Sequence, residues 1–281
     1  EALGRLRRRM RPFLLRRTKE QVAADLPAKT EQVLSVELGA KHRKAYDQRL
    51  ARERQRILGL LEEDTAQSRF VALKALTTLR QMALDPALVD GEDGAEPEAV
   101  EAAESAGGEE NGEAAGGKGG SGKRAARGKG AKGSDAGAPA AGRRGPGRRP
   151  SPSAKVEVLV EHLGPILSEG HRALVFSQFT RYLSGVREHL EATGVRTAYM
   201  DGSTPDRQKV IDAFRAGEAD VFLISLKAGG FGLTLTEADY VFLLDPWWNP
   251  QAEEQAVDRT HRIGQDKPVM VYRLVSADTI E

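Results

Sequence analysis

The sequence of 281 residues contains no cysteine, which excludes disulfide bonds and thiolate metal sites and is typical of a reducing compartment. Its five histidines lack the spacing of metal ligands, so we expect no bound metal. No apolar run reaches the roughly 18 residues of a membrane-spanning helix, and the first residues are too rich in arginine for a signal peptide. An excess of one charge is also missing, because 42 Lys and Arg residues face 41 Asp and Glu residues.

The composition changes abruptly between residues 90 and 152. Gly, Ala, Ser, Pro and charged residues dominate there, and such a segment cannot bury enough apolar surface to offset its ordering entropy. We therefore predict a disordered low-complexity insertion over 90–152. Residues 90–113 hold ten acids and no base, whereas residues 114–150 hold ten bases and one acid. The basic half suits loose binding of nucleic acid, and a solvated surface loop explains it as well.

Before the insertion, the sequence predicts helices and one strand. The first thirty residues hold nine bases and three acids and are punctuated by Pro12 and Pro27, which indicates a basic helical connector. Residues 32–38 alternate apolar and polar side chains, as a strand does. A helix is expected from residue 41 to about 61, and a second helix ends at Asp85-Pro86. The expected buried stripe of the second helix consists of Leu73, Leu76, Leu79 and Met82.

From Ala154 onward, short apolar segments alternate with amphipathic ones. The expected strands are 173–176, 197–200, 221–224, 240–244 and 269–274. Strands that alternate with helices predict a parallel α/β sheet with helices on both faces. Ligands of such sheets bind beyond the carboxyl ends of the strands.

Polar and glycine-rich motifs follow these strands. Ser177 and Gln178 follow the first, and Gly202, Ser203 and Thr204 follow the second, where a hydroxyl would cap the next helix. Amides at that helix start suit a DNA phosphate, and a purely local helix start explains the same residues. A third motif, residues 225–236, combines glycines that allow close backbone approach with a lysine and hydroxyls that suit an anion. Its candidate residues are Ser225, Lys227, Ala228, Gly229, Gly230, Gly232, Thr234 and Thr236.

A cluster of polar side chains follows near the end of the chain. At 3.6 residues per turn, Gln255, Arg259 and Arg262 fall on one face of a helix. Two guanidinium groups and an amide suit a group whose negative charge is spread over several oxygens, of which a nucleotide phosphate is the leading candidate. A solvated helix face, paired with Asp258 and its acidic neighbours, is the alternative. His261 has no partner at ligand spacing, which favours a structural role.

Three blocks, residues 225–236, the segment Asp-Pro-Trp-Trp-Asn-Pro at residues 245–250, and residues 255–265, together resemble the second motor lobe of the Swi/Snf-type DNA-dependent ATPases, a branch of the superfamily-two helicase-like translocases. The Arg-Pro-Phe-Leu-Leu-Arg-Arg segment at residues 11–17 is similar to the connector between the family's two lobes. The resemblance implies an α/β fold with a RecA-like parallel sheet flanked by helices. It also implies four parts: a connector with the last strand of the missing first lobe (1–38), a helical protrusion (39–89), the insertion (90–152) and the second RecA-like lobe (153–281).

The resemblance assigns roles to the candidate residues. Arg259 and Arg262 would act as arginine fingers on the γ-phosphate with Gln255 orienting them. The residues near the nucleotide would be Gly230, Gly232 and Asp258. Those at the DNA backbone would be Ser177, Gln178, Gly202, Ser203, Thr204, Ser225, Lys227, Ala228, Gly229, Thr234 and Thr236. ATP with Mg²⁺ would be held mainly by the first lobe, whose GxxxxGK[ST] motif this sequence lacks on any strand-to-helix turn. We therefore expect an excised piece that does not hydrolyse ATP alone.

The implied function is that of the second lobe of an ATP-dependent translocase on double-stranded DNA, which remodels protein–DNA complexes. Its partners would be double-stranded DNA, the first RecA-like lobe and a DNA-bound complex such as RNA polymerase. Two alternatives stay open: a binding module without motor function, and the lobe of a strand-separating RNA helicase. The Ala-, Arg- and Gly-rich insertion favours a GC-rich bacterium, hence a cytoplasmic or nucleoid location; a eukaryotic protein of this kind would be nuclear.

Overall fold

The computed structural model describes residues 26–58, 66–89, 153–226, 228, 233–247 and 249–281, together with residues 4–5, 9–10 and 12. The predicted insertion and most of the predicted connector lie outside the described residues. Within the part of the chain that is described, no helix is both long and apolar enough to cross a membrane.

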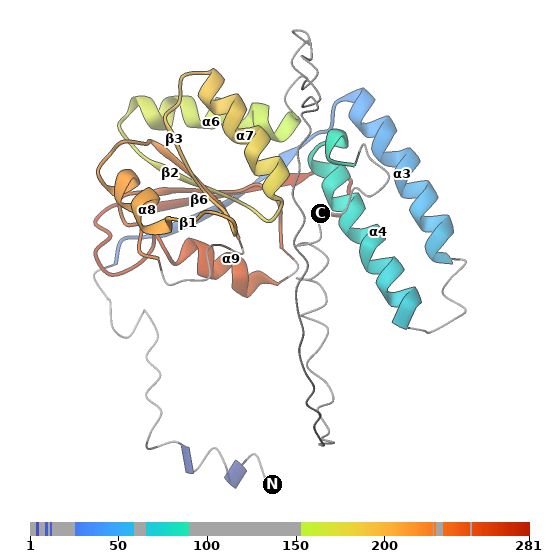
Figure 1. Cartoon of the computed structure of the whole chain (residues 1–281), viewed down its shortest axis with the longest axis horizontal. Helices are drawn as coiled ribbons and strands as arrows, with labels where there is room; N and C mark the ends of the chain where they lie inside the picture. The colour runs from blue at the N-terminus through green and yellow to red at the C-terminus, as the bar shows by residue number, and fades with distance from the viewer. Residues whose placement is uncertain are drawn as a thin grey trace, which may run out of the picture.

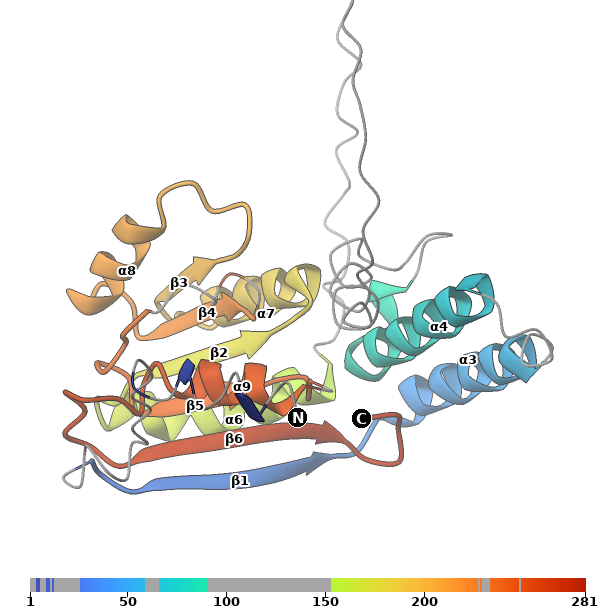
Figure 2. The ribbon, with the colours of Figure 1, turned by 90° about the horizontal axis from the view of Figure 1, so that it is seen from below.

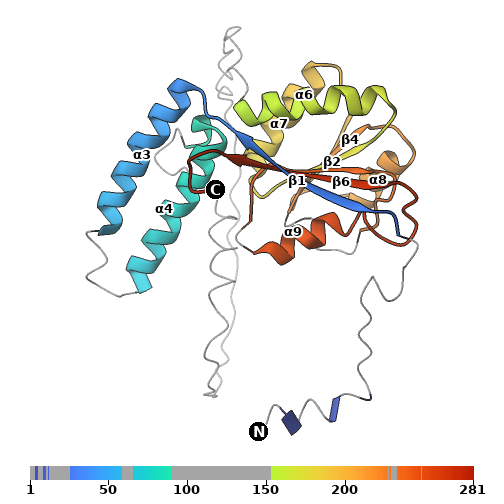
Figure 3. The ribbon, with the colours of Figure 1, turned by 180° about the vertical axis from the view of Figure 1, so that it is seen from behind.

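The described strands form one six-stranded sheet in which every pairing is parallel. The strand order is β1-β6-β5-β2-β4-β3. The strands are β1 (Lys29–Val36), β2 (Ala173–Ser177), β3 (Thr197–Met200), β4 (Val221–Ser225), β5 (Tyr240–Leu243) and β6 (Val269–Ser276). Helices α6 (Ala154–Ser168) and α7 (Thr180–Ala192) cover one face, and α8 (Arg207–Arg215) and α9 (Pro250–Val257) cover the other (Figures 1 and 3). The predicted two-sided parallel α/β fold is confirmed.

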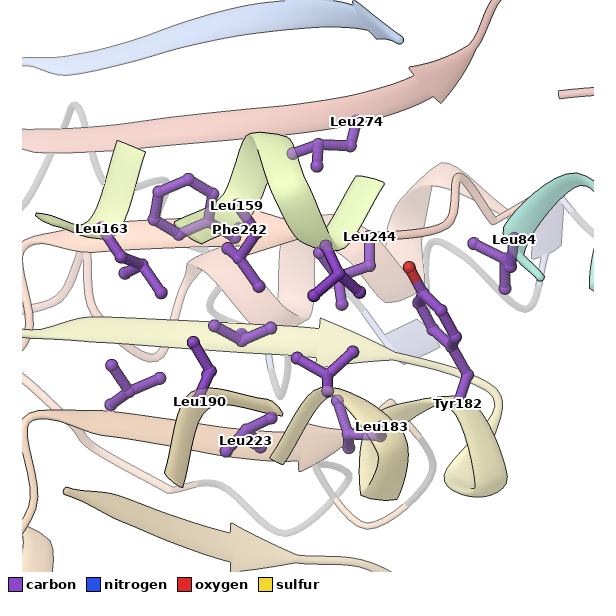
Figure 4. Packing of buried hydrophobic residues seen from close by; sticks show 14 of the residues in the cluster. Leu84, Leu159, Leu163, Tyr182, Leu183, Leu190, Leu223, Phe242, Leu244 and Leu274 are labelled. Carbon is purple, nitrogen blue, oxygen red and sulfur yellow. The ribbon is translucent and has the colours of Figure 1, made fainter. Parts of the chain in front are cut away.

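The sheet has a hydrophobic core on each face. Every residue of β2 and of β4 is buried, as expected for central strands covered on both sides. Under α6 and α7, Leu159 and Leu163 of the first helix and Leu183 of the second belong to one buried cluster with Phe242 of the sheet (Figure 4). Under α8 and α9, Phe214 and its apolar neighbours fill the second core. The two cores thus hold the strands, and with them the loops that follow the strand ends, in fixed positions.

Strand β1 corrects one prediction. We expected this strand to belong to the sheet of a missing lobe, but it pairs with β6 along its whole length, from Lys29 beside Val269 to Val36 beside Ser276. The prediction was wrong because alternation defines a strand without naming its partner, and Val36 finds its apolar contacts in the core under α6. On the opposite face of β1, Val33 is 63% exposed.

The protrusion is a pair of helices, α3 (Ala40–Leu58) and α4 (Ala66–Leu84), followed by the 3₁₀ helix η2 (Pro86–Leu88). It lies beside the edge of the sheet at which the strand arrows end (Figure 2). Tyr46 of α3 packs against Leu79 and Met82 of α4. Leu76, which we expected in the buried stripe, is 43% exposed, because residues spaced three apart shift around a helix by about 60° at each step, so four of them cannot all face the same partner.

A buried ion pair ties α6 to the segment that follows β6. Lys155 is only 1% exposed, and its Nζ lies 2.5 Å from the carboxylate of Glu281. The same ammonium donates to the carbonyl oxygens of Leu244 (2.7 Å) and Leu274 (2.9 Å). Burial lowers the pKa of Lys155, although the nearby Glu281 opposes that shift. The charge is therefore kept in the core by one anion and two carbonyl dipoles.

Candidate functional site

The carboxyl ends of the six parallel strands lie at the edge of the sheet beside the protrusion (Figure 2), and the predicted strand-end residues lie there too. Ser177 of β2 pairs with Ser225 of β4, and the backbone amide of Gln178 donates to both carboxylate oxygens of Asp245 at 3.2 and 3.3 Å. All three predicted side chains are buried. Ser177 Oγ accepts from the amide of Phe179, and Ser225 Oγ accepts from the amide of Ala228. These two hydroxyl groups therefore shape the loops.

The loop after β3 is more open. Gly202 and Ser203 are exposed, and the carboxylate of Asp201 accepts from the amide and hydroxyl of Ser203 (2.8 and 2.7 Å) and from the hydroxyl of Thr204 (3.2 Å). Burial raises the pKa of Asp201, but these hydrogen bonds outweigh it and hold the pKa below its ordinary value. The loop is thus fixed by an ionised carboxylate, with its outer backbone accessible.

The helix cap in this loop is not the one that we predicted. Helix α8 begins at Arg207, and its N-cap is Asp206, whose side chain accepts from the amide of Lys209 at 3.1 Å. Ser203 and Thr204 bond to Asp201 instead, because they lie too far before the helix to reach its free amides.

Replacing Asp206 with alanine should lower the free energy of unfolding by about 1 kcal/mol, because the Lys209 amide loses its acceptor. Ser203→Ala is the matched control and should change it by less than about 0.5 kcal/mol. Urea denaturation of both variants measures the difference. Equal losses in the two variants would assign the cap to Ser203 after all.

The two arginines lie in a tight turn, so the expectation of one helical face was wrong. Helix α9 ends at Val257 with Asp258 as its C-cap, and the amides of Thr260 and His261 both turn back onto the carbonyl of Val257 at 3.1 Å. Arg259 and Arg262 of the predicted face therefore lie beyond the end of the helix. Gln255 stays on α9, where it is exposed.

Arg259 and Arg262 have different surroundings. Arg259 is 6% exposed, its Nε and Nη1 have no hydrogen-bond partner among the described residues, and burial lowers the pKa of its guanidinium. Arg262 is exposed and donates to the hydroxyl of Thr234 at 3.2 Å. The turn therefore presents one buried cation with spare donors and one cation at the surface.

The structure divides the motif at residues 225–236, which we had treated as one unit, into two sets of residues. Thr234 lies against the arginine turn through Arg262, and the amide of the next residue, Leu235, donates to the carbonyl of Arg259 at 2.9 Å. Thr234 and Thr236 thus belong with the arginine turn, whereas Ser225 and Ala228 stay at the end of β4. Four predicted site residues lie outside the described residues: Lys227, Gly229, Gly230 and Gly232.

Arg80 on α4 is a site residue that the sequence pattern did not reveal. Its guanidinium donates to Gln178 Oε1 at 3.2 Å and to the carbonyl of Pro246, and it lies over the rings of Trp247 (5.4 Å) and Phe179 (5.9 Å). Burial lowers the pKa of Arg80 against the attraction of nearby carboxylates. The protrusion is therefore bonded to the loops after β2 and β5. The signal in the sequence is weak: an arginine directly beside the apolar residue Leu79 of the predicted stripe.

Residues 154–264 match the family model described as "Helicase conserved C-terminal domain", so the parallel sheet with polar loops at its carboxyl edge and an arginine-bearing turn is a helicase-type lobe. Residues 1–88 match the model described as "SNF2-related domain". The chain belongs to the Swi/Snf family and contains its helicase C-terminal lobe. The family resemblance that the sequence motifs indicated is confirmed.

Several curated proteins are similar to this chain. Human "SWI/SNF-related matrix-associated actin-dependent regulator of chromatin subfamily A member 1" is 31% identical over 281 residues, which is 99% of this chain and 22% of that protein. Mouse "Chromodomain-helicase-DNA-binding protein 1-like" is 34% identical over 284 residues, 100% of this chain and 26% of that protein. "Protein CHROMATIN REMODELING 24" of Arabidopsis thaliana is 43% identical over 132 residues, 46% of this chain and 12% of that protein. The chain thus spans about a quarter or less of these relatives.

A solved structure supports the fold. The crystal structure of the C-terminal part of the Fun30 ATPase domain matches with a TM-score of 0.59 at 21% sequence identity. The match covers 91% of this chain and 87% of that chain. At this identity the likeness concerns the arrangement of helices and strands.

Proposed function

We propose that this chain is the second motor lobe of an ATP-dependent translocase on double-stranded DNA that remodels protein–DNA complexes. The observation that carries the proposal is the guanidinium of Arg259, which is buried with two nitrogens unpartnered among the described residues. A buried cation without an anion is costly. The solvated-face alternative does not apply to a side chain that is 6% exposed, so the charge is best explained by an anion that arrives from outside.

The residues of the arginine turn fit a nucleotide phosphate as that anion. ATP with Mg²⁺, held mainly by a first motor lobe, would supply the phosphoryl group. Arg259 would stabilise negative charge through its two nitrogens that have no partner among the described residues, and Arg262, oriented by Thr234, would act beside it. Gln255 on the neighbouring helix would orient the pair. Three further residues keep their proposed place near the nucleotide: Gly230, Gly232 and Asp258.

The carboxyl edge would meet the DNA backbone. Gly202, Ser203 and Thr204 offer an accessible loop, and Lys227 with the glycines around it would supply the close contact after β4. Ser177, Gln178 and Ser225 would act indirectly, because their side chains are buried and shape the loops. Thr234 and Thr236 would act beside the arginines rather than on DNA. Apart from the strand β1, we retain the four parts inferred from the sequence.

Two other functions are less well supported. A binding module without motor function would gain nothing from burying Arg259 unpaired, and an RNA helicase lobe is disfavoured by the match of residues 1–88 to the SNF2-related model. The relatives named above are eukaryotic, which would place such a protein in the nucleus. A bacterial source and an RNA polymerase target stay predictions from the composition and the family resemblance.

Binding of duplex DNA by the whole protein should weaken steeply with salt and vary little with sequence, because phosphate contacts release counterions. Lys227→Ala should weaken every sequence equally and reduce the salt slope by about one. Lys267→Ala, an exposed lysine just before the amino end of β6, is the control. Fluorescence anisotropy at several salt concentrations provides the measurement. Binding that ignores salt, or equal effects of the two variants, would contradict the proposed DNA edge.

A further inference from the structure

Gln265 is a buried amide with every hydrogen-bonding group in use. It is 6% exposed, and its Nε2 donates toward the carbonyls of Ala238 (2.9 Å), Thr236 (3.2 Å) and Thr260 (3.2 Å). Its Oε1 accepts from the amides of the next two residues at 3.1 and 3.0 Å. A buried polar group with this many partners fixes the backbone around it, because each broken bond would leave a buried group unsatisfied.

The partners of Gln265 belong to two different segments. Thr260 lies within the arginine turn, between Arg259 and Arg262, whereas Thr236 and Ala238 lie in the segment that follows β4 along the chain. The same two segments are joined by the Leu235 amide and by the contact of Arg262 with Thr234. Gln265 therefore lies at the buried end of the contact between these two segments, and Arg262 lies at its exposed end.

The backbone before Gln265 supports this placement. Gly264 has a φ of +102°, a conformation that residues with a Cβ rarely adopt. That turn reverses the chain after Arg262, and the amide of Gln265 donates to the carbonyl of Arg262 at 2.9 Å. The glycine thus allows the turn after which the Gln265 side chain is buried.

We propose that Gln265 is a positioning residue that holds Arg259 and Arg262 in a fixed place relative to the segment after β4. Through this contact, DNA binding at the carboxyl edge is coupled to the position of the arginines. This inference rests on the proposed function. Glutamine suits the task because one group must donate to carbonyls and also accept from amides. Glutamate has the same shape but cannot donate when ionised, and methionine keeps the approximate volume without either kind of bond.

The test uses the protein with both motor lobes and compares Gln265→Glu, Gln265→Met and the control Gln208→Glu. Gln208 is an exposed glutamine of α8 whose amide donates to Asp212 at 2.9 Å, so its substitution makes the same chemical change elsewhere. Circular dichroism first selects a temperature at which all variants are folded. Steady-state ATP hydrolysis is then measured with and without saturating duplex DNA, together with DNA affinity.

Both Gln265 variants should lower the DNA-stimulated kcat by about a hundredfold, the typical cost of misplacing a reacting group by roughly 1 Å. The KM for ATP and the Kd for DNA should stay within about twofold, since Gln265 touches neither ligand, and the ratio of stimulated to unstimulated rates should fall. Gln208→Glu should leave the rates unchanged. If only one Gln265 variant folds, that variant decides the result.

A second comparison separates this inference from the proposed function. Because Gln265 acts through the arginines, Gln265→Glu added to Arg259→Ala should cost little beyond Arg259→Ala alone. The positioning role would be overturned if folded Gln265 variants kept more than half of the wild-type kcat. It would also be overturned if the fold-loss in kcat of the double variant equalled the product of the losses of the two single variants. If Arg259→Ala itself keeps the wild-type rate, the proposed function fails, whatever the Gln265 variants do.

Discussion

In a protein that carries both motor lobes, replacing Arg259 or Arg262 with alanine should lower DNA-stimulated ATP hydrolysis about a thousandfold or more, the typical worth of an arginine finger. The loss should appear in kcat and hardly in KM, because the guanidinium contributes chiefly when charge develops in the transition state. Arg259 should be the more sensitive of the two, since it is buried with unpartnered nitrogens. Lysine should not rescue either position, because a point ammonium cannot reproduce the planar fork.

The control for this experiment is Arg187→Ala, which removes an exposed arginine of α7 that pairs with Glu191 at 2.7 Å. It should leave the rate unchanged. Steady-state assays at saturating ATP and duplex DNA decide the question. If both alanine variants at the turn keep more than about a tenth of the wild-type rate, far above the rate expected without an arginine finger, the two arginines have no catalytic role.

The second large effect concerns stability. Lys155→Met should lower the free energy of unfolding of the 281-residue chain by about 3–5 kcal/mol, because the carboxylate of Glu281 would be left buried without its cation. The two carbonyls that Lys155 now satisfies would also lose their donor. Urea denaturation followed by circular dichroism measures the change.

Two comparisons sharpen the stability test. Arg187→Met breaks an exposed pair of similar length and should cost at most about 0.5 kcal/mol. Lys155→Met combined with Glu281→Leu should recover much of the loss, since apolar replacement of both partners removes the uncompensated charge. A cost below about 1 kcal/mol for Lys155→Met would contradict the buried pair and suggest that Glu281 reaches solvent.

The sheet could be predicted because its central strands are apolar on both faces and must therefore be covered by helices on both sides. The segments that became β2 and β4 are continuously apolar and short, which fits strands covered on both faces, and the helices between them have clear apolar stripes. Parallel pairing then placed the strand-end residues Ser177, Gln178 and Ser225 at one edge, as observed.

Other features depend on contacts between distant residues, which spacing along the chain does not encode. The alternation in β1 gave a strand but not its neighbour β6. The helical spacing of Gln255, Arg259 and Arg262 ignored the turn that begins after Val257, where the amide of His261 reverts to the Val257 carbonyl. The position of Arg80 beside an apolar stripe did not identify its partners either, because they are almost a hundred or more residues away along the chain.

The central claim is that Arg259 stabilises the transition state of ATP hydrolysis. The most direct measurement compares the affinities of the two-lobed protein for ATP and for ADP with aluminium fluoride, a mimic of the transferring phosphoryl group, in the wild type and in Arg259→Ala. We predict that the variant binds ATP with nearly unchanged affinity and binds the mimic about a hundredfold or more weakly, as expected for an interaction made chiefly in the transition state. Equal affinities of the two proteins for the mimic would contradict the account.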